Sequence, residues 1–225
     1  MNLTEVRFLT PLDAFLGGCL LIVILALCVN LQLQSVPLVY AVAVIALFLC
    51  AFLTLRFRRT AGHFRGLWIL VFLSLFLYPF ADLFLESSFR LVTYNTADPK
   101  LIKTPVYVIL YWAFGILLFG HVCHRVKELT QKKWLSGLVT GLFAALSTLL
   151  VETLFNEAEF YSNTPSVVMI GKIPVYVPLG YFLVFSFMPF FIQYKYVFGV
   201  WLYPLTGLAW IFLYYVFLGT ATFST

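Results

Sequence analysis

Residues 134–155 read WLSGLVTGLFAALSTLLVETLF, an apolar run with a single ionisable side chain, Glu152. A run of about 20 apolar residues is long enough for a helix that crosses the roughly 30 Å hydrocarbon core of a bilayer. Within the run, Gly137, Gly141 and Ala145 recur every four residues, a spacing that lets a second helix approach closely. The run therefore predicts a membrane-spanning helix with one packing face.

The packing face leads to a carboxyl group. Continued in steps of three or four residues, the same stripe passes through Thr148 and Glu152 to Asn156 and Glu159. A carboxylate at the edge of a hydrocarbon layer is costly, so we expect Glu152 to face the bundle interior and to have a partner or a purpose. Three interpretations stay open: a hydrogen bond that fixes helix packing, a functional acid, and a side chain that reaches to the interface.

The rest of the chain has the same apolar character. Of its 225 residues, 63% are hydrophobic and only 10% are charged, and the mean hydropathy is +1.00. A soluble domain of this length cannot bury so much apolar surface. We therefore expect an all-α, polytopic membrane protein, one transmembrane domain over residues 1–225. We predict seven transmembrane helices, at residues 11–32, 36–55, 67–85, 105–122, 134–155, 175–192 and 198–219.

The basic residues predict the orientation. With the N-terminus inside, the inner segments carry ten of the 14 Lys and Arg residues and the outer segments carry four. Basic residues favour the inner side, so the N-terminus is expected inside and the C-terminus outside, in a bacterial or archaeal inner membrane. We expect membrane lipid as a partner and no nucleic acid, because the basic groups are spread over separate short loops.

Acidic residues gather at the predicted outer ends of the spans. The candidate site residues there are Asp82, Glu86, Glu152, Asn156 and Glu159. Asp82 and Glu86 are one helical turn apart, and Arg90 follows after another turn. Like charges at this spacing repel, so one carboxyl is expected to be held protonated or to pair with Arg90. The alternatives are solvated helix ends and a shared acid–base pocket between the third and fifth spans.

Two long outer loops, residues 86–104 and 156–174, are placed to roof such a site. The histidines, by contrast, are all expected at the inner side. His121 and His124 lie beside Arg125 and Lys127, which repel cations, so we expect interfacial polar residues there and no metal site. A retinal Schiff base needs a lysine in the last span, and the last predicted span contains none, so the count of seven spans does not imply a photoreceptor.

A stretch in the second half of the chain carries a resemblance. Residues 171–182 read GKIPVYVPLGYF, and Glu152 and Tyr161 precede them. This combination resembles carotenoid-biosynthesis membrane proteins of the bacterioruberin hydratase type over about residues 152–182. The family's glycine-rich stretch between the glutamate and the tyrosine is replaced here by residues 156–160. The resemblance implies an isoprenoid or pigment ligand.

Three functions from different classes follow. The leading hypothesis is a metal-independent acid–base enzyme without a cofactor, which hydrates, cyclises or isomerises an isoprenoid, a carotenoid or another lipid. Glu152 or Asp82 would protonate a double bond, and aromatic rings, which make up 19% of the chain, would stabilise the cation. The alternatives are an accessory subunit bound to other membrane subunits of a photosynthetic or respiratory complex, and a proton- or ion-coupled transporter.

Overall fold

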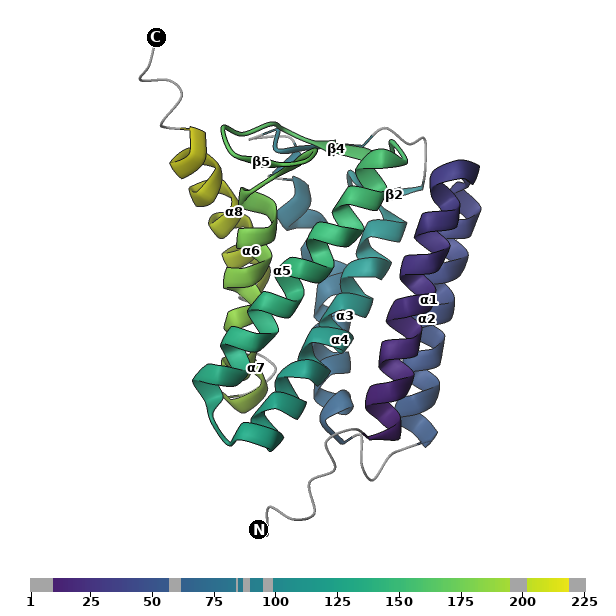
Figure 1. The fold of residues 1–225 in the computed structure, drawn as a ribbon, viewed down its shortest axis with the longest axis vertical. Coiled ribbons are helices and arrows are strands. Elements are labelled where there is room, and N and C mark those ends of the chain that lie inside the picture. The colour runs from purple at the N-terminus through teal and green to yellow at the C-terminus, as the bar shows by residue number, and fades with distance from the viewer. Residues whose placement is uncertain are drawn as a thin grey trace.

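The computed structural model describes residues 10–56, 62–83, 85–86, 90–94, 99–194 and 202–218. The fold is a bundle of helices that run along its long axis, with short strands gathered at one end (Figure 1). The helices are α1 (Pro11–Leu33), α2 (Val36–Arg56), α3 (Gly62–Leu83), α4 (Val106–Thr130), α5 (Lys133–Glu157), α6 (Tyr176–Ser186), α7 (Met188–Tyr194) and α8 (Leu202–Leu218). The prediction of an all-α protein is therefore confirmed.

Some of the described helices have the length and composition of membrane spans. Four of them, α1, α2, α4 and α5, are long and apolar enough to cross a bilayer, or five if the bent α3 counts as one span. The bend of 43° in α3 separates Gly62–Leu73 from Leu75–Leu83. Pro79 explains this bend, because proline has no backbone N–H to donate to the carbonyl group one turn earlier. By the same criteria, α6, α7 and α8 are shorter than a full span.

Three of the predicted boundaries need correction. The third helix was expected to begin at residue 67, but α3 begins five residues earlier, at Gly62. The fourth helix was expected to end near residue 122, but α4 continues to Thr130 because hydropathy marks the end of an apolar stretch and not the end of a helix. The sixth was expected to run unbroken over residues 175–192, but it is divided into α6 and α7 at Phe187. Pro189, the second residue of α7, cannot donate a hydrogen bond back across this break.

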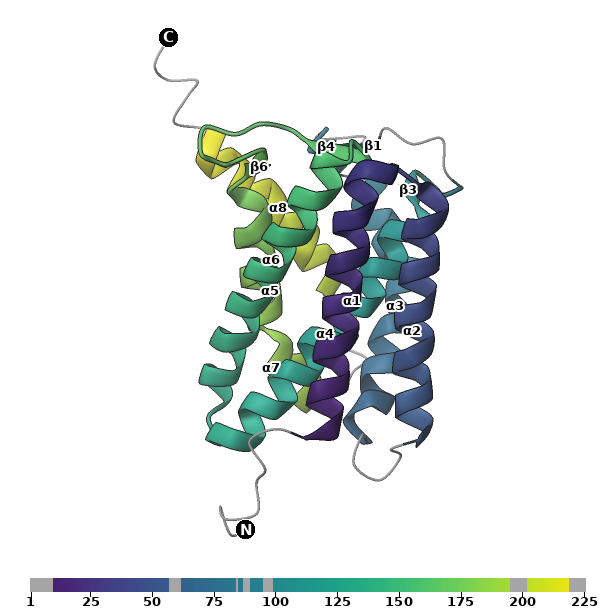
Figure 2. The same cartoon turned by 45° about the vertical axis from the view of Figure 1, so that its right-hand side comes forward.

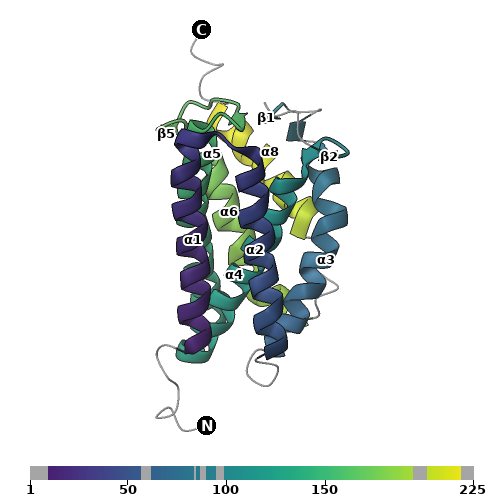
Figure 3. The ribbon, with the colours of Figure 1, turned by 90° about the vertical axis from the view of Figure 1, so that its right-hand side faces the viewer.

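Helix α4 forms the centre of the bundle and contacts α2, α3, α5 and α7. Figures 2 and 3 show α1 and α2 side by side along one flank of α4. Helices α1 and α2 form a tight hairpin, in which Asn30 Oδ1 accepts a hydrogen bond of 2.9 Å from the amide of Ser35. The hairpin thus forms one wall of the bundle.

The glycine stripe of α5 packs against α6, as its spacing predicted. A Cβ atom at Gly137 would lie 2.5 Å from the carbonyl oxygen of Ser186, and one at Gly141 would lie 2.6 Å from that of Phe182. Only glycine permits this approach of the two backbones. The same face of α5 carries Glu152, which is 6% exposed. The prediction that this residue faces the bundle interior is confirmed.

The strands join the two long loops. Strand β1 (Val92–Tyr94) pairs antiparallel with β4 (Tyr161–Asn163), so that Tyr94 lies opposite Tyr161. Two hairpins flank this pair: β2 (Lys100–Leu101) with β3 (Thr104–Pro105), and β5 (Met169–Ile170) with β6 (Ile173–Pro174). All six strands lie at the end of the bundle where α5 ends (Figure 1). We call the pair β1 and β4 the ribbon.

Candidate functional site

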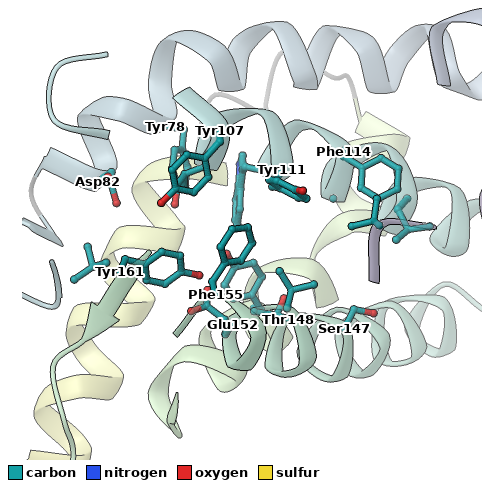
Figure 4. A pocket seen from close by; sticks show the side chains of 18 of the residues that line it. Tyr78, Asp82, Tyr107, Tyr111, Phe114, Ser147, Thr148, Glu152, Phe155 and Tyr161 are labelled. Carbon is teal, nitrogen blue, oxygen red and sulfur yellow. The ribbon is translucent and has the colours of Figure 1, made fainter. Parts of the chain in front are cut away.

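A cavity lies inside the bundle next to the ribbon. Its walls come from α1, α3, α4, α5 and α6, and both strands of the ribbon contribute to them. Two acidic side chains line it, Asp82 from the last turn of α3 and Glu152 from α5. Figure 4 shows both carboxyl groups at the same end of the cavity, with the hydroxyl of Tyr161 directed toward Glu152. The structure therefore brings together two of the acids that the sequence singled out.

Asp82 is held by two hydroxyl groups. Tyr94 Oη donates to both carboxyl oxygens at 2.9 Å, and Thr104 Oγ1 donates to Oδ2 at 2.6 Å. Asp82 is 1% exposed, so these bonds replace the water that the carboxyl group loses on burial. Tyr94 belongs to β1 and Thr104 to β3, which means that the loop between α3 and α4 returns to cover the residue at its start.

Glu152 is held in a similar way by the second loop. Asn163 Nδ2 donates to Oε2 at 3.0 Å, and the hydroxyl of Tyr161 also hydrogen-bonds to the carboxyl group. Both partners belong to β4. Asn156, one turn after Glu152, donates from its Nδ2 to the carbonyl oxygen of Glu152 at 3.0 Å, so it supports the helix end and not the carboxyl group.

The ribbon connects the two acids. Tyr94 binds Asp82, Tyr161 binds Glu152, and the two tyrosine rings lie edge to face with centroids 5.8 Å apart. Burial, followed by the charge of the adjacent carboxyl group, raises the pKa of each phenol well above its usual value of about 10. Both tyrosines therefore stay protonated at neutral pH and remain hydrogen-bond donors.

Aromatic rings surround the acidic end of the cavity. Trp112 stacks on Tyr78 with centroids 5.0 Å apart and meets Tyr181 edge to face at 5.2 Å. Phe155 stacks on Tyr161 at 5.6 Å. All five residues line the cavity. Ring faces attract positive charge, so this wall is suited to stabilise a cation that forms near the carboxyl groups.

The other candidate residues lie outside the cavity lining. Glu86 follows the end of α3 in a short helical turn. The continuous helical stripe through Glu159 was a wrong prediction, because α5 ends at Glu157 and Glu159 is exposed with a left-handed φ of 60°. Within the described ranges Arg90 forms no ion pair with Asp82 or Glu86, so of the two expected alternatives the pairing with Arg90 is wrong.

The sequence did not single out the groups that hold the acids, namely Tyr94, Thr104 and Asn163. They lie in loops, where no hydrophobic period marks a residue as buried. Tyr94 and Asn163 each lie two positions from another buried residue in a short extended segment, and such short segments are common in exposed strands as well.

A second polar group, which we call the inner cluster, lies at the opposite end of the bundle. It consists of Asp13, His63, His121, His124, Arg125 and Glu128. Asp13 accepts from Arg125 Nε at 3.1 Å and is 2.7 Å from His121 Nε2, while His121 Nδ1 lies 3.0 Å from His63 Nε2. Glu128 pairs with Arg125 and His124. The sequence placed the histidines near this end but missed their convergence with Asp13.

No three His, Cys, Asp or Glu residues in the described part of the chain are arranged to hold a metal ion. The inner cluster instead ties α1, α3 and α4 together by ion pairs and hydrogen bonds.

Comparison with known proteins gives one match. The model of a family described as "Domain of unknown function (DUF6989)" matches residues 79–224, a range that includes Asp82, Glu152 and both strands of the ribbon. No curated protein and no solved structure matches the chain.

Proposed function

We propose that this chain, which belongs to the family described as a domain of unknown function (DUF6989), is a membrane enzyme that performs acid–base chemistry on an unsaturated lipid. One observation carries the proposal: Asp82 and Glu152, from different helices, share an aromatic-lined cavity inside an apolar bundle. Burying a carboxyl group in apolar surroundings costs free energy, and a catalytic role would explain why the chain carries two of them there.

The chemistry needs one proton donor and one acceptor. Glu152 gives its proton to one carbon of a double bond, whose π electrons form the new C–H bond and leave a cation on the neighbouring carbon. The rings of Trp112 and Phe155 stabilise that cation. Asp82 then removes a proton from an attacking water, which completes hydration, or from a carbon next to the cation, which completes isomerisation. In cyclisation a second double bond of the same lipid first attacks the cation, so that its π electrons form the ring bond, and Asp82 removes a proton from a carbon next to the new cation. These steps require neither a metal ion nor a cofactor.

The resemblance of about residues 152–182 to carotenoid-biosynthesis membrane proteins of the bacterioruberin hydratase type supports an isoprenoid or carotenoid as the lipid. Tyr161, the loop tyrosine of that resemblance, hydrogen-bonds to Glu152. Since this bond holds the carboxyl group at the cavity, Tyr161 orients the proposed acid.

The proposed arrangement in the membrane has seven spans, the N-terminus inside and the C-terminus outside, in a bacterial or archaeal inner membrane. It is supported by the positions of the first and last described helices, because α1 begins at one end of the bundle and α8 ends at the other (Figure 2). The excess of basic residues at the end where α1 begins supports the same orientation. The acids then lie near the outer interface.

The test is the substitution Glu152→Gln, which keeps the size of the side chain and removes its proton-transfer ability. Lipid and pigment extracts of cells that express the protein are compared by mass spectrometry with those of cells carrying the empty vector. We expect a product that depends on the protein and disappears in Glu152→Gln and in Asp82→Asn. The matched control is Glu157→Gln, on the same helix, whose carboxylate is exposed and paired with Lys172. A product that persists in Glu152→Gln at unchanged level would refute the acid role.

Proton- or ion-coupled transport is a second candidate, and the inner cluster is the observation that favours it. Ionisable groups then stand at both ends of the bundle, as a transport path requires. Uptake by vesicles that contain the purified protein, driven by an imposed proton gradient, tests this function. Transport that depends on both Glu152 and His121 would support it over the enzyme.

A further inference from the structure

The cavity continues from the two acids along α4. Tyr107 and Phe119 both line it and lie twelve positions apart on this helix, a rise of about 18 Å. This is more than half of the roughly 30 Å hydrocarbon core of a bilayer. The cavity thus has an acidic end near the ribbon and a long arm that reaches toward the middle of the bundle.

The two ends differ in chemistry. At the acidic end the carboxyl groups and the tyrosine hydroxyls gather (Figure 4). Along the arm the lining is mostly hydrocarbon, from Phe114, Leu118 and Phe119 of α4 and from Leu20 and Val23 of α1. Ser147 and Thr148 on α5 and Tyr111 on α4 add hydroxyl groups to the lining, and that of Tyr111 donates to the carbonyl oxygen of Val39 at 3.3 Å.

Gly115 lies in the wall of the arm and differs from the packing glycines of the bundle. At Gly120 an added Cβ would meet the side chain of Leu67 on α3, and at Gly137 and Gly141 it would meet α6. At Gly115 the three nearest heavy atoms all belong to the ring of Phe119 on the same helix, the closest at 3.3 Å. The ring of Phe119 lies against the position that a side chain at residue 115 would take, and both residues line the cavity. A large side chain at residue 115 therefore has to displace this ring or project into the arm.

We propose that the arm holds the hydrocarbon tail of a single lipid molecule, with the reactive end at Asp82 and Glu152, and that Gly115 determines how long a tail fits. The identity of the reactive end rests on the proposed function, whereas binding of the tail requires no catalysis. A tail that leaves the bilayer for an apolar cavity gains little from the hydrophobic effect, because lipid is equally apolar. Selection therefore depends on shape, and a bulky residue in the wall excludes the tail.

Trp112 provides the measurement, since it lines the cavity and is 5% exposed. The full chain, with Trp112 as its one tryptophan and the others replaced by phenylalanine, is purified in detergent. It is then titrated with an 18-carbon alcohol brominated at its middle carbons and with a brominated eight-carbon alcohol, because bromine quenches indole fluorescence on contact. A protein that keeps only Trp134, which is 68% exposed, reports quenching from outside the cavity.

Gly115→Phe is the test variant, and Leu142→Phe, on the exposed side of α5, is its matched control. We expect Gly115→Phe to weaken quenching of Trp112 by the long alcohol at least about tenfold, to retain quenching by the short one, and to leave quenching of Trp134 unchanged. Leu142→Phe should behave as the parent protein does. If Gly115→Phe does not fold, Gly115→Ala replaces it, with a smaller shift in the same direction.

The outcomes separate this inference from the proposed function. Unchanged binding of the long alcohol by a folded Gly115→Phe, or equal loss of both alcohols, overturns the role of Gly115. Loss of the long alcohol alone supports that role even if Glu152→Gln keeps its lipid product, in which case only the proposed chemistry fails.

Discussion

The two polar ends of the bundle hold their acids in different ways. In the inner cluster, Asp13 and Glu128 both pair with Arg125, and each also contacts a histidine. At the ribbon, the hydrogen bonds to Asp82 and Glu152 come from neutral hydroxyl and amide groups. Removing one partner of an ion pair leaves the other charge uncompensated and destabilises the fold. A buried carboxyl group in a cavity is a candidate functional group. The difference predicts that the inner cluster contributes stability and, under the proposed function, that the ribbon end carries the chemistry.

The largest effect that the comparison predicts is at Arg125. Arg125→Ala leaves two carboxylates near each other without their shared cation, and we expect it to lower the free energy of unfolding by about 3 kcal/mol. Denaturant unfolding in detergent, followed by circular dichroism, measures this change. The exposed Arg65→Ala serves as the control and should change stability by less than about 0.5 kcal/mol. If the two substitutions lower the free energy of unfolding equally, the ion pairs of Arg125 do not stabilise the inner cluster, and the predicted difference between the two ends is wrong.

Replacing one aspartate by asparagine at each end compares how much each carboxylate charge contributes to stability. Asp13→Asn removes the charge that faces Arg125, so we expect a loss of about 2 kcal/mol. Asp82→Asn keeps an oxygen that accepts from Tyr94 and Thr104, so we expect a loss below about 1 kcal/mol. The unfolding assay used for Arg125 applies to both. A larger loss for Asp82→Asn would mean that the ribbon end is also held by charge.

Tyr94→Phe sharpens the description of the ribbon. It removes one donor to Asp82 and leaves the bond from Thr104, so we expect a loss of about 1 kcal/mol in the same assay. Thr93→Ala, on the exposed side of the same strand, is the control and should have a smaller effect. If the two variants are equally stable, the hydroxyl of Tyr94 contributes nothing to the fold.

The smallest predicted effect is a pH dependence. The pKa values of Tyr94 and Tyr161 are raised in the folded protein, so above about pH 10 the unfolded chain loses protons that the folded chain keeps. Stability contributed by these phenols is present below that pH and is lost as the pH rises further. Unfolding measured from pH 8 to pH 11 should show a decline that is shallower in Tyr161→Phe. An identical decline in both proteins would contradict the raised pKa.

The sequence predicted most of the helices because the cause of a helix in an apolar stretch is local. Residues 11–32 and 36–55 became α1 and α2 with ends displaced by one residue. The predictions failed where a proline divides an apolar stretch, as at Pro189, and where a helix continues into polar sequence, as after residue 122. Hydropathy alone reports neither feature, because it averages over a window.

The candidate site was predicted in part. Asp82 and Glu152 were singled out since carboxyl groups are rare in apolar stretches, and the structure brings both to one cavity. Glu86 and Glu159 were included by helical spacing, but the helices end before each of them. Helical spacing counted along the sequence does not show where the helix ends.

The sequence by itself determined that the chain is helical and apolar, and that Glu152 lies on the packing face of its helix. Those properties depend on composition and on spacing within one segment, which the linear order of residues contains. Only the tertiary structure decided that β1 pairs with β4, that Tyr94 of β1 donates to Asp82 while β4 supplies donors to Glu152, and that Gly115 lines a cavity. These features join segments far apart in the chain, and their energies come from contacts that exist only after the helices have packed.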